Sequence, residues 1–185
     1  MNQTETSRWK TLDRFVEINS HWVKLIAEHL ETTEGKTVEY WRVERADSVV
    51  ILTIQADKLL FPKPMYRPGV ASATLDFPGG RLPAGSTPSA AVPAIIKKEL
   101  GVTESAIARI EPLNAIGWAI NSSFSNQKLY GFVARLHPAA TVNPERIGAT
   151  YPTTPDGIRN LLKELTCLQC RALLLEWQNQ NNFRF

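Results

Sequence analysis

The stretch Leu75-Asp76-Phe77-Pro78-Gly79-Gly80-Arg81-Leu82-Pro83-Ala84-Gly85-Ser86 decides the fold of this 185-residue chain. It begins as the apolar end of a strand, enters a glycine-rich turn and ends in a start signal for a helix. Glycines let backbone amides approach an anion closely, and Ser86 before Pro88 is a candidate N-cap. Such a turn favours phosphate binding, although a turn that simply needs positive φ explains the same residues.

A second segment, Ala94-Ile95-Ile96-Lys97-Lys98-Glu99-Leu100-Gly101-Val102, stands at a fixed distance from Gly80. The pair resembles the Nudix box, in which Gly is followed after five residues by Glu, and after seven more by Arg-Glu-hydrophobic-any-Glu-Glu-any-Gly-hydrophobic. The positions that fit are Gly80, Ile96, Glu99, Gly101 and Val102, and those that depart are Ser86, Ala94, Ile95 and Lys98. The frame of the motif is therefore intact, while most of its acids are replaced.

The resemblance covers most of the chain and is nearest to the ADP-ribose pyrophosphatase branch of Nudix proteins, which has a Tyr-Arg where this chain has Tyr66-Arg67. It implies an α/β fold, a Nudix-type α/β/α sandwich with a mixed sheet and extra N-terminal strands. Those strands often exchange across a homodimer in relatives. We therefore expect residues 1–45 to be a dimerisation element and residues 46–185 to be the Nudix-fold domain.

The departures fall on the positions where the box carries its metal ligands. Its later glutamates lie at i, i+3 and i+4 of one helix, so their carboxylates converge on one face and hold Mg²⁺ against a diphosphate. Here these positions are Ile95, Lys98 and Glu99, with no net charge. Glu99 is the one retained box acid, hence the one candidate for catalysis and for weak metal binding, and we expect catalysis to be impaired.

Two function classes follow from the resemblance. In the first, the chain binds an ADP-ribose-like, nucleoside-diphosphate-linked ligand with little or no hydrolysis and no cofactor, using Arg67, Gly79, Gly80, Arg81 and Lys98. In the second, it is an active pyrophosphohydrolase that builds a Mg²⁺ or Mn²⁺ site from Glu99 and the acids Asp76, Glu104 or Glu111. A scaffold that binds no nucleotide is a third option.

The polar loop 120–127 is a candidate for substrate selection, because loops at this end of the sheet select the substrate in the family. Its candidate residues are Asn121, Ser122 and Ser123. An ordinary polar hairpin loop explains the same composition.

Composition predicts a single compact domain. The net charge of +3 is too small to indicate a nucleic-acid partner, and the absence of a long apolar run predicts no membrane span and a cytoplasmic location. Cys167 and Cys170 form a C-x-x-C, but the chain has no second pair and its three histidines are scattered. We therefore expect both cysteines to pack on the core rather than to bind metal.

The remaining elements follow from periodicity. Residues 9–30 have apolar spacing that favours an amphipathic helix, whereas the resemblance favours strands, which we adopt. Further strands are expected at 47–55, 58–61, 107–118 and 128–136. Helices are expected at 88–100, kinked or restarted at Pro93, at 155–165 with Asp156 able to cap it, and at 168–178.

Overall fold

The computed structural model describes residues 8–181, so the ends of both expected segments, 1–7 and 182–185, lie outside it. The chain forms two compact units, residues 1–46 with 119–127 and residues 47–118 with 128–185. The contact pattern thus adds residues 119–127 to the N-terminal strands. Whether the N-terminal strands form a dimerisation element stays a prediction.

The first unit is built on an antiparallel three-stranded meander of β1 (Lys10–Asn19), β2 (Lys24–Glu31) and β3 (Thr37–Glu44), in the order β1-β2-β3. The turns are fixed locally. Gly35 has φ +74°, and its amide donates to the carbonyl of Thr32, closing the second hairpin. The strand interpretation of residues 9–30 is therefore correct, and the helical spacing was misleading.

The misleading spacing has a physical cause in β1. Its register against β2 shifts between Thr11 and Asp13 and again between Arg14 and Val16. Each shift inserts an extra residue into the strand, which moves the following side chains to the other face. Two such bulges turn a period of two into apolar positions three or four residues apart, and this is the spacing of a helix.

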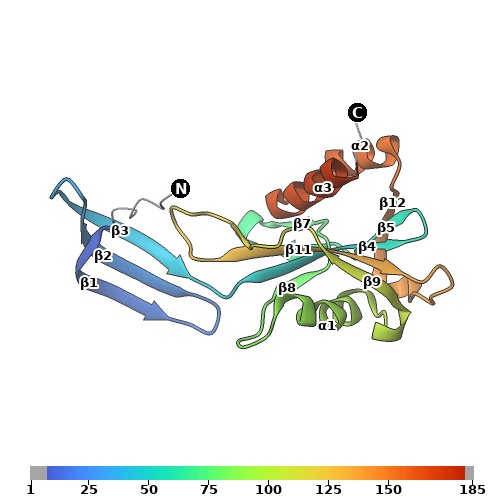
Figure 1. Ribbon diagram of the computed structural model, residues 1–185, viewed down its shortest axis with the longest axis horizontal. Helices are drawn as coiled ribbons and strands as arrows, with labels where there is room; N and C mark the ends of the chain where they lie inside the picture. Colours follow the sequence, from blue (N-terminus) through green and yellow to red (C-terminus); the bar gives the residue numbers. More distant parts are fainter. Residues whose placement is uncertain (1–7, 182–185) are drawn as a thin grey trace, which may run out of the picture. The chain divides into compact units, whose positions relative to one another are not determined.

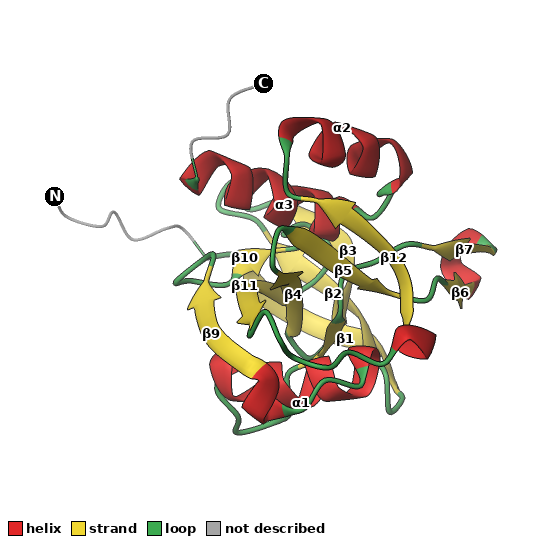
Figure 2. Cartoon of the chain, turned by 90° about the vertical axis from the view of Figure 1, so that its right-hand side faces the viewer, coloured by secondary structure: helices red, strands yellow, loops and turns green. Residues whose placement is uncertain are grey.

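The second unit is a mixed seven-stranded sheet with helices on both faces (Figures 1 and 2). The strand path is β10 (Trp118–Ala119), β11 (Lys128–Leu136), β4 (Ser48–Gln55), β5 (Lys58–Pro62) and β12 (Ile147–Pro152). β8 (Gly79–Arg81) also pairs with β4, and β9 (Ile107–Pro112) with β11. β4 and β11 are parallel, and β6 (Met65–Arg67) with β7 (Ser72–Thr74) forms a separate small hairpin.

Successive side chains of the central strands point to opposite faces of the sheet, and their contacts show which helix covers each face. Phe132 and Ala134 of β11 join the buried cluster of α1 (Pro88–Leu100), with Val49 and Ile51 of β4. Gly131, one residue earlier, faces α3 (Leu168–Gln180), since a Cβ there would lie 2.0 Å from Cδ2 of Leu173. α2 (Pro155–Glu164) precedes α3 on that same side in both views. This is the expected α/β/α arrangement.

Two local expectations are wrong. The strand expected at 107–118 stops at Pro112, because the buried Asn114 side chain bonds the Leu129 carbonyl (2.9 Å) and the Gly131 amide (2.8 Å) in place of the ladder. At α2 the cap is Thr154, whose Oγ1 accepts from the Gly157 amide at 3.2 Å, and Asp156 instead pairs with Arg159. Of the described helices, none is long and apolar enough to cross a membrane.

Candidate functional site

The glycine segment is held by the central strand of the sheet. Gly79, Gly80 and Arg81 of β8 pair with Val50, Val49 and Ser48 of β4. Neither Gly79 nor Gly80 has positive φ, whereas Gly85, in the turn that follows, has φ +76°. Positive φ therefore accounts for Gly85 alone, and close approach accounts for the other two. At Gly79 a Cβ would meet the Val49 carbonyl oxygen at 3.3 Å.

Helix α1 begins after Thr87, which is its N-cap but makes no capping hydrogen bond with its side chain, so the expected cap at Ser86 is wrong. The helix runs without interruption through Pro93 to Leu100 and ends at Gly101, which has φ +71°. Pro93 neither restarts nor ends the helix. Its ring costs one backbone hydrogen bond on a half-buried stretch, which the buried face of α1 compensates.

Ile95 is part of the core rather than of a polar site. It is 8% exposed, and a Cβ placed on Gly80 would lie 3.2 Å from its Cγ1. This position carries a glutamate in the Nudix box. Here a branched apolar side chain, that of Ile95, packs against β8 where that carboxylate would lie.

Lys98 and Glu99 follow one turn later. The Lys98 side chain is 80% exposed, that of Glu99 is 16% exposed, and Lys98 Nζ lies 3.5 Å from Glu99 Oε1. The retained acid is thus partly covered and already paired with a cation. Because the Lys98 ammonium is exposed, the pair contributes little to stability, and Lys98 can exchange Glu99 for another partner.

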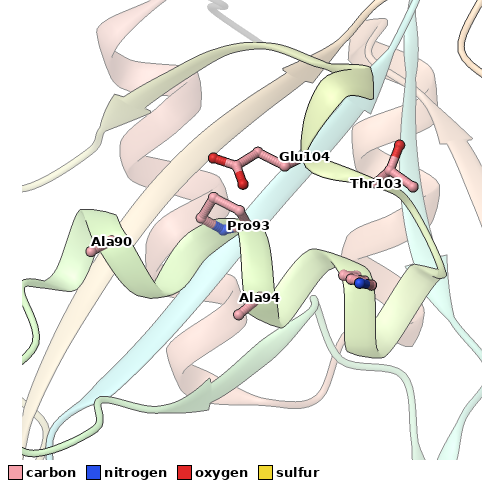
Figure 3. Close-up of a pocket in the computed structure, with 6 residues that line it drawn as sticks. Ala90, Pro93, Ala94, Thr103 and Glu104 are labelled. Carbon is pink, nitrogen blue, oxygen red and sulfur yellow. The ribbon is translucent and has the colours of Figure 1, made fainter.

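A shallow pocket of about 330 Å³ lies beside α1 (Figure 3). Ala90, Pro93, Ala94 and Lys97 line it from one helix face, and Thr103 and Glu104 close it from the segment after the helix. Its residues on α1 differ from the buried ones, so it opens on the solvent side of the helix. The sequence signal was the small side chains at helical spacing, Ala90 and Ala94, which leave room there. Of the acids expected outside the box, Glu104 is the one in this pocket.

The other expected residues lie in separate places. Arg67 donates to Asp76 Oδ2 from Nη2 at 2.8 Å and from Nε at 3.1 Å. Glu111 pairs with Arg109 and Arg135. The structure therefore places Ile95 against Gly80, with Lys98 and Glu99 following on α1 and paired with each other, whereas Arg67 is paired with Asp76.

The loop residues Asn121, Ser122 and Ser123 belong to the first unit. The Tyr40 hydroxyl donates to the Ser123 carbonyl, and Ser123 Oγ donates to Asn121 Oδ1 at 2.9 Å. The next residue also binds β3, since the Val43 amide donates to the Phe124 carbonyl at 2.8 Å. Two backbone carbonyls of this loop thus accept hydrogen bonds from β3, while the side chains of Asn121 and Ser123 bond each other.

A cluster that sequence reasoning missed joins Asp76 to Cys167 and Cys170. Their ligand atoms all lie within 4.8 Å of one another, and theirs is the one such group of three in residues 8–181. A hydrogen bond from Cys170 lowers the pKa of Cys167 to about 6, and the same contact together with burial raises that of Cys170. The sequence shows the C-x-x-C but not the distant carboxylate that completes the group.

The fold defined by this sheet and its helices is a Nudix-type α/β fold. A solved crystal structure of an "ADP compounds hydrolase" has this fold, with a TM-score of 0.74 and 19% identity, over 95% of each chain. In all, 175 solved chains match, so the likeness identifies an architecture rather than a substrate. No protein-family model matches the sequence, and no curated protein does.

Proposed function

We propose that this protein binds a nucleoside-diphosphate-linked molecule of the ADP-ribose kind, with weak or no hydrolysis, at the neighbourhood formed by β8 and the C-terminal half of α1. The single observation that carries the proposal is the burial of Ile95 against Gly80. The fold likeness to a hydrolase of ADP compounds supports the ligand class. The cytoplasm is its proposed location.

Efficient hydrolysis would need more metal ligands than the residues around Glu99 provide. A Mg²⁺ ion that bridges a diphosphate needs several oxygen ligands, usually from more than one carboxylate. The two positions that would supply further metal ligands beside Glu99 are Ile95, which is apolar and buried, and Lys98, which is a cation. At 4 Å and an effective dielectric constant near 20, a unit charge contributes about 4 kcal/mol, and Lys98 opposes a cation by an amount of this order before solvent screening reduces it.

The same lysine favours an anion. Lys98 stands one turn beyond the Ile95–Gly80 contact with its ammonium in solvent, where a diphosphate could replace Glu99 as its partner. Charge-assisted bonds to phosphate oxygens are shorter and stronger than an exposed lysine–carboxylate pair. Arg81 of β8 adds a second cation near this neighbourhood. Fixed cations would then supply the charge that a metal supplies in an active enzyme.

Two assays test the proposal. Binding of ADP-ribose, NADH and nucleotide sugars is measured by calorimetry in excess chelator, with Lys98→Ala as the site variant and exposed Lys58→Ala of β5 as the charge-matched control. We expect metal-independent binding that Lys98→Ala weakens roughly tenfold, the loss of about 1.4 kcal/mol. Unchanged affinity in Lys98→Ala would overturn the assigned site.

Turnover of the same compounds with Mg²⁺ or Mn²⁺, read by chromatography, separates the proposal from its alternative. Cleavage that disappears in Glu99→Gln would identify an active pyrophosphohydrolase that recruits acids beyond the box. If none of these compounds binds, with or without metal, the result would favour a scaffold that binds no nucleotide.

We also propose a homodimer, with a second copy covering the exposed aromatic side chains of the β1–β3 sheet. Phe15 stacks on His29 with ring centroids 4.7 Å apart and meets Trp41 edge-on at 6.0 Å. Phe15 and Trp41 are each 42% exposed, and Leu12 and Ile18 are exposed as well. Exposed aromatic side chains in contact with one another are typical of a protein interface.

A further inference from the structure

Three potential metal ligands from two distant parts of the chain converge at the start of α3. Cys167 is the N-cap residue of α3 and Cys170 lies in its first turn, while Asp76 lies between β7 and β8. All three ligand atoms lie within 4.8 Å of one another. The site is on the α3 side of the sheet, whereas the Nudix-box helix α1 packs on the other side, so it is separate from the neighbourhood of Glu99.

The chemistry of the donors selects the ion. Two sulfurs with one carboxylate oxygen suit zinc and other thiophilic divalent ions, whereas Mg²⁺ and Ca²⁺ prefer oxygen donors throughout. Zinc accepts cysteine and aspartate in one tetrahedral shell, with Zn–S distances of about 2.3 Å and Zn–O distances of about 2.0–2.2 Å. Ligand atoms within 4.8 Å of one another are compatible with such a shell after small side-chain rotations.

Neighbouring groups already orient these ligands. Thr74 Oγ1 and the Arg67 guanidinium all donate to Oδ2 of Asp76, which leaves Oδ1 for a cation. The Phe77 amide donates to Cys170 Sγ at 3.4 Å, within the range of a hydrogen bond to sulfur. Outer partners of this kind fix the direction of metal ligands and tune their basicity.

Charge and burial also fit a bound cation. Cys170 is 2% exposed and the Asp76 side chain 16% exposed, so two thiolates beside this carboxylate would be a costly concentration of negative charge. A divalent cation together with Arg67 would balance the three anionic ligands. A disulfide between the two cysteines would leave Asp76 without a role in the cluster.

We propose that Asp76, Cys167 and Cys170 form a three-ligand site for Zn²⁺, with the fourth position open to solvent or to a ligand. The ion would tie the segment that leads into Gly79 and Gly80 to the start of α3. Its binding releases the thiol protons to solvent, so affinity rises with pH. This site is independent of the proposed nucleotide binding.

Cobalt provides the direct test, because Co²⁺ bound by thiolates has a charge-transfer band in the near ultraviolet. Reduced, chelator-stripped protein is titrated with Co²⁺ and then with Zn²⁺, whose affinity is read by competition with a chromogenic chelator. The chain has only these two cysteines, so a thiolate band reports this site alone. We expect a single ion per chain, displacement of Co²⁺ by Zn²⁺, and a rise in Tm with Zn²⁺.

Three variants locate the ligands. Cys167→Ser should remove most of the thiolate band. Asp76→Asn should keep the band while weakening Zn²⁺ binding at least roughly tenfold, because loss of an outer partner of a ligand alone costs about ten- to a hundredfold. Glu145→Gln, at an exposed acid that belongs to neither proposed site, is the control and should behave as the parent protein does. Circular dichroism checks that each variant is folded, and Asp76→Asn keeps the test valid if a cysteine variant unfolds.

Three results would overturn the proposal: reduced, folded protein with no thiolate–cobalt band, cysteine variants that bind Zn²⁺ as tightly as the parent, or Asp76→Asn with unchanged affinity. The last two would place the metal elsewhere or remove Asp76 from the shell. The first, together with an intrachain disulfide formed in air, would make the cysteines a redox pair instead.

Discussion

Gly80 and Ile95 are in such close contact that a Cβ added to the glycine would lie 3.2 Å from Cγ1 of the isoleucine. The contact joins strand β8 to helix α1, at the position that by its resemblance to the Nudix box would carry a metal-binding glutamate. A glutamate at position 95 would therefore disturb the packing between β8 and α1 before it could serve catalysis.

Ile95→Glu should destabilise the protein rather than restore an enzyme. The change removes a side chain that is 8% exposed and introduces a carboxylate between α1 and β8, which we expect to lower the free energy of unfolding by about 3 kcal/mol or more. Urea denaturation measures the loss, with Ile95→Val as the conservative control at about 1 kcal/mol. A stable Ile95→Glu variant with Mg²⁺-dependent turnover would contradict this prediction, because it would show that the contact between α1 and β8 tolerates a carboxylate.

Gly157→Ala should be among the more damaging single-methyl changes. A Cβ there would lie 2.2 Å from the Pro152 carbonyl oxygen, so backbone must move at the junction of β12 and α2. We expect a loss of about 2–3 kcal/mol, read by thermal or urea unfolding. Gly69→Ala is the matched control, since a Cβ at Gly69 meets nothing within 4 Å. Equal stabilities for the two variants would contradict the geometry.

The capping pattern predicts unequal effects at two threonines. Thr154 Oγ1 accepts from the Gly157 amide at 3.2 Å, whereas the Thr87 side chain makes no capping bond to α1. Thr154→Ala should therefore cost about 1 kcal/mol of unfolding free energy, and Thr87→Ala should cost clearly less. The same denaturation assay decides, and a larger effect at Thr87 would refute the assignment.

Glu28 makes the first unit sensitive to acid. Its side chain is 4% exposed and is bonded by Arg42 and Arg14 across the sheet, and the hydrogen bonds from Arg42 hold its pKa below the ordinary value of 4.5. A lowered folded pKa adds stability above the unfolded pKa, and this stability is lost as the pH falls through the folded pKa. Glu28→Gln should cost about 2 kcal/mol near pH 7 and progressively less below pH 4.5. If the difference in unfolding free energy between the parent protein and Glu28→Gln stays constant with pH, the charge of Glu28 does not account for it.

Disrupting the exposed aromatic pair should abolish self-association. Phe15→Ser with Trp41→Ser removes two exposed rings of the β1–β3 sheet whose centroids lie 6.0 Å apart, so we expect light scattering to fall from the mass of a dimer to that of a monomer. Because both rings are 42% exposed, the monomer should keep its fold. Ile116→Ser, at a side chain 78% exposed in the second unit, is the control and should not change the mass. A monomeric parent protein would refute the dimer directly.

The α/β fold could be predicted because its strongest signals are local. The buried strands β4 and β5, the frame from Gly80 to Gly101 and the final helices all have patterns that depend on neighbours along the chain. The bulges of β1 could not be predicted in this way, because they are defined by register against β2. Asn114 likewise ends a strand through bonds to residues more than a dozen positions away.

The candidate site was predicted less well for the same reason. The residues at the positions that resemble the Nudix box are visible in the sequence, and they predict a helix face with no net charge. The sequence does not show that Ile95 packs against Gly80 or that Arg67 forms an ion pair with Asp76. Nor does it show that Asp76 lies beside the two cysteines. These relationships join residues from different elements, and they depend on how the elements pack.

The return of residues 119–127 to the first unit has a consequence for dividing this protein. The chain leaves that unit after residue 46, comes back once, and departs again, so no single cut separates the two units. A fragment that starts at residue 47 would keep a loop whose backbone partners on β3, such as Val43, had been deleted. Isolating either half therefore calls for redesigning this loop, and a short linker in its place would be the first choice.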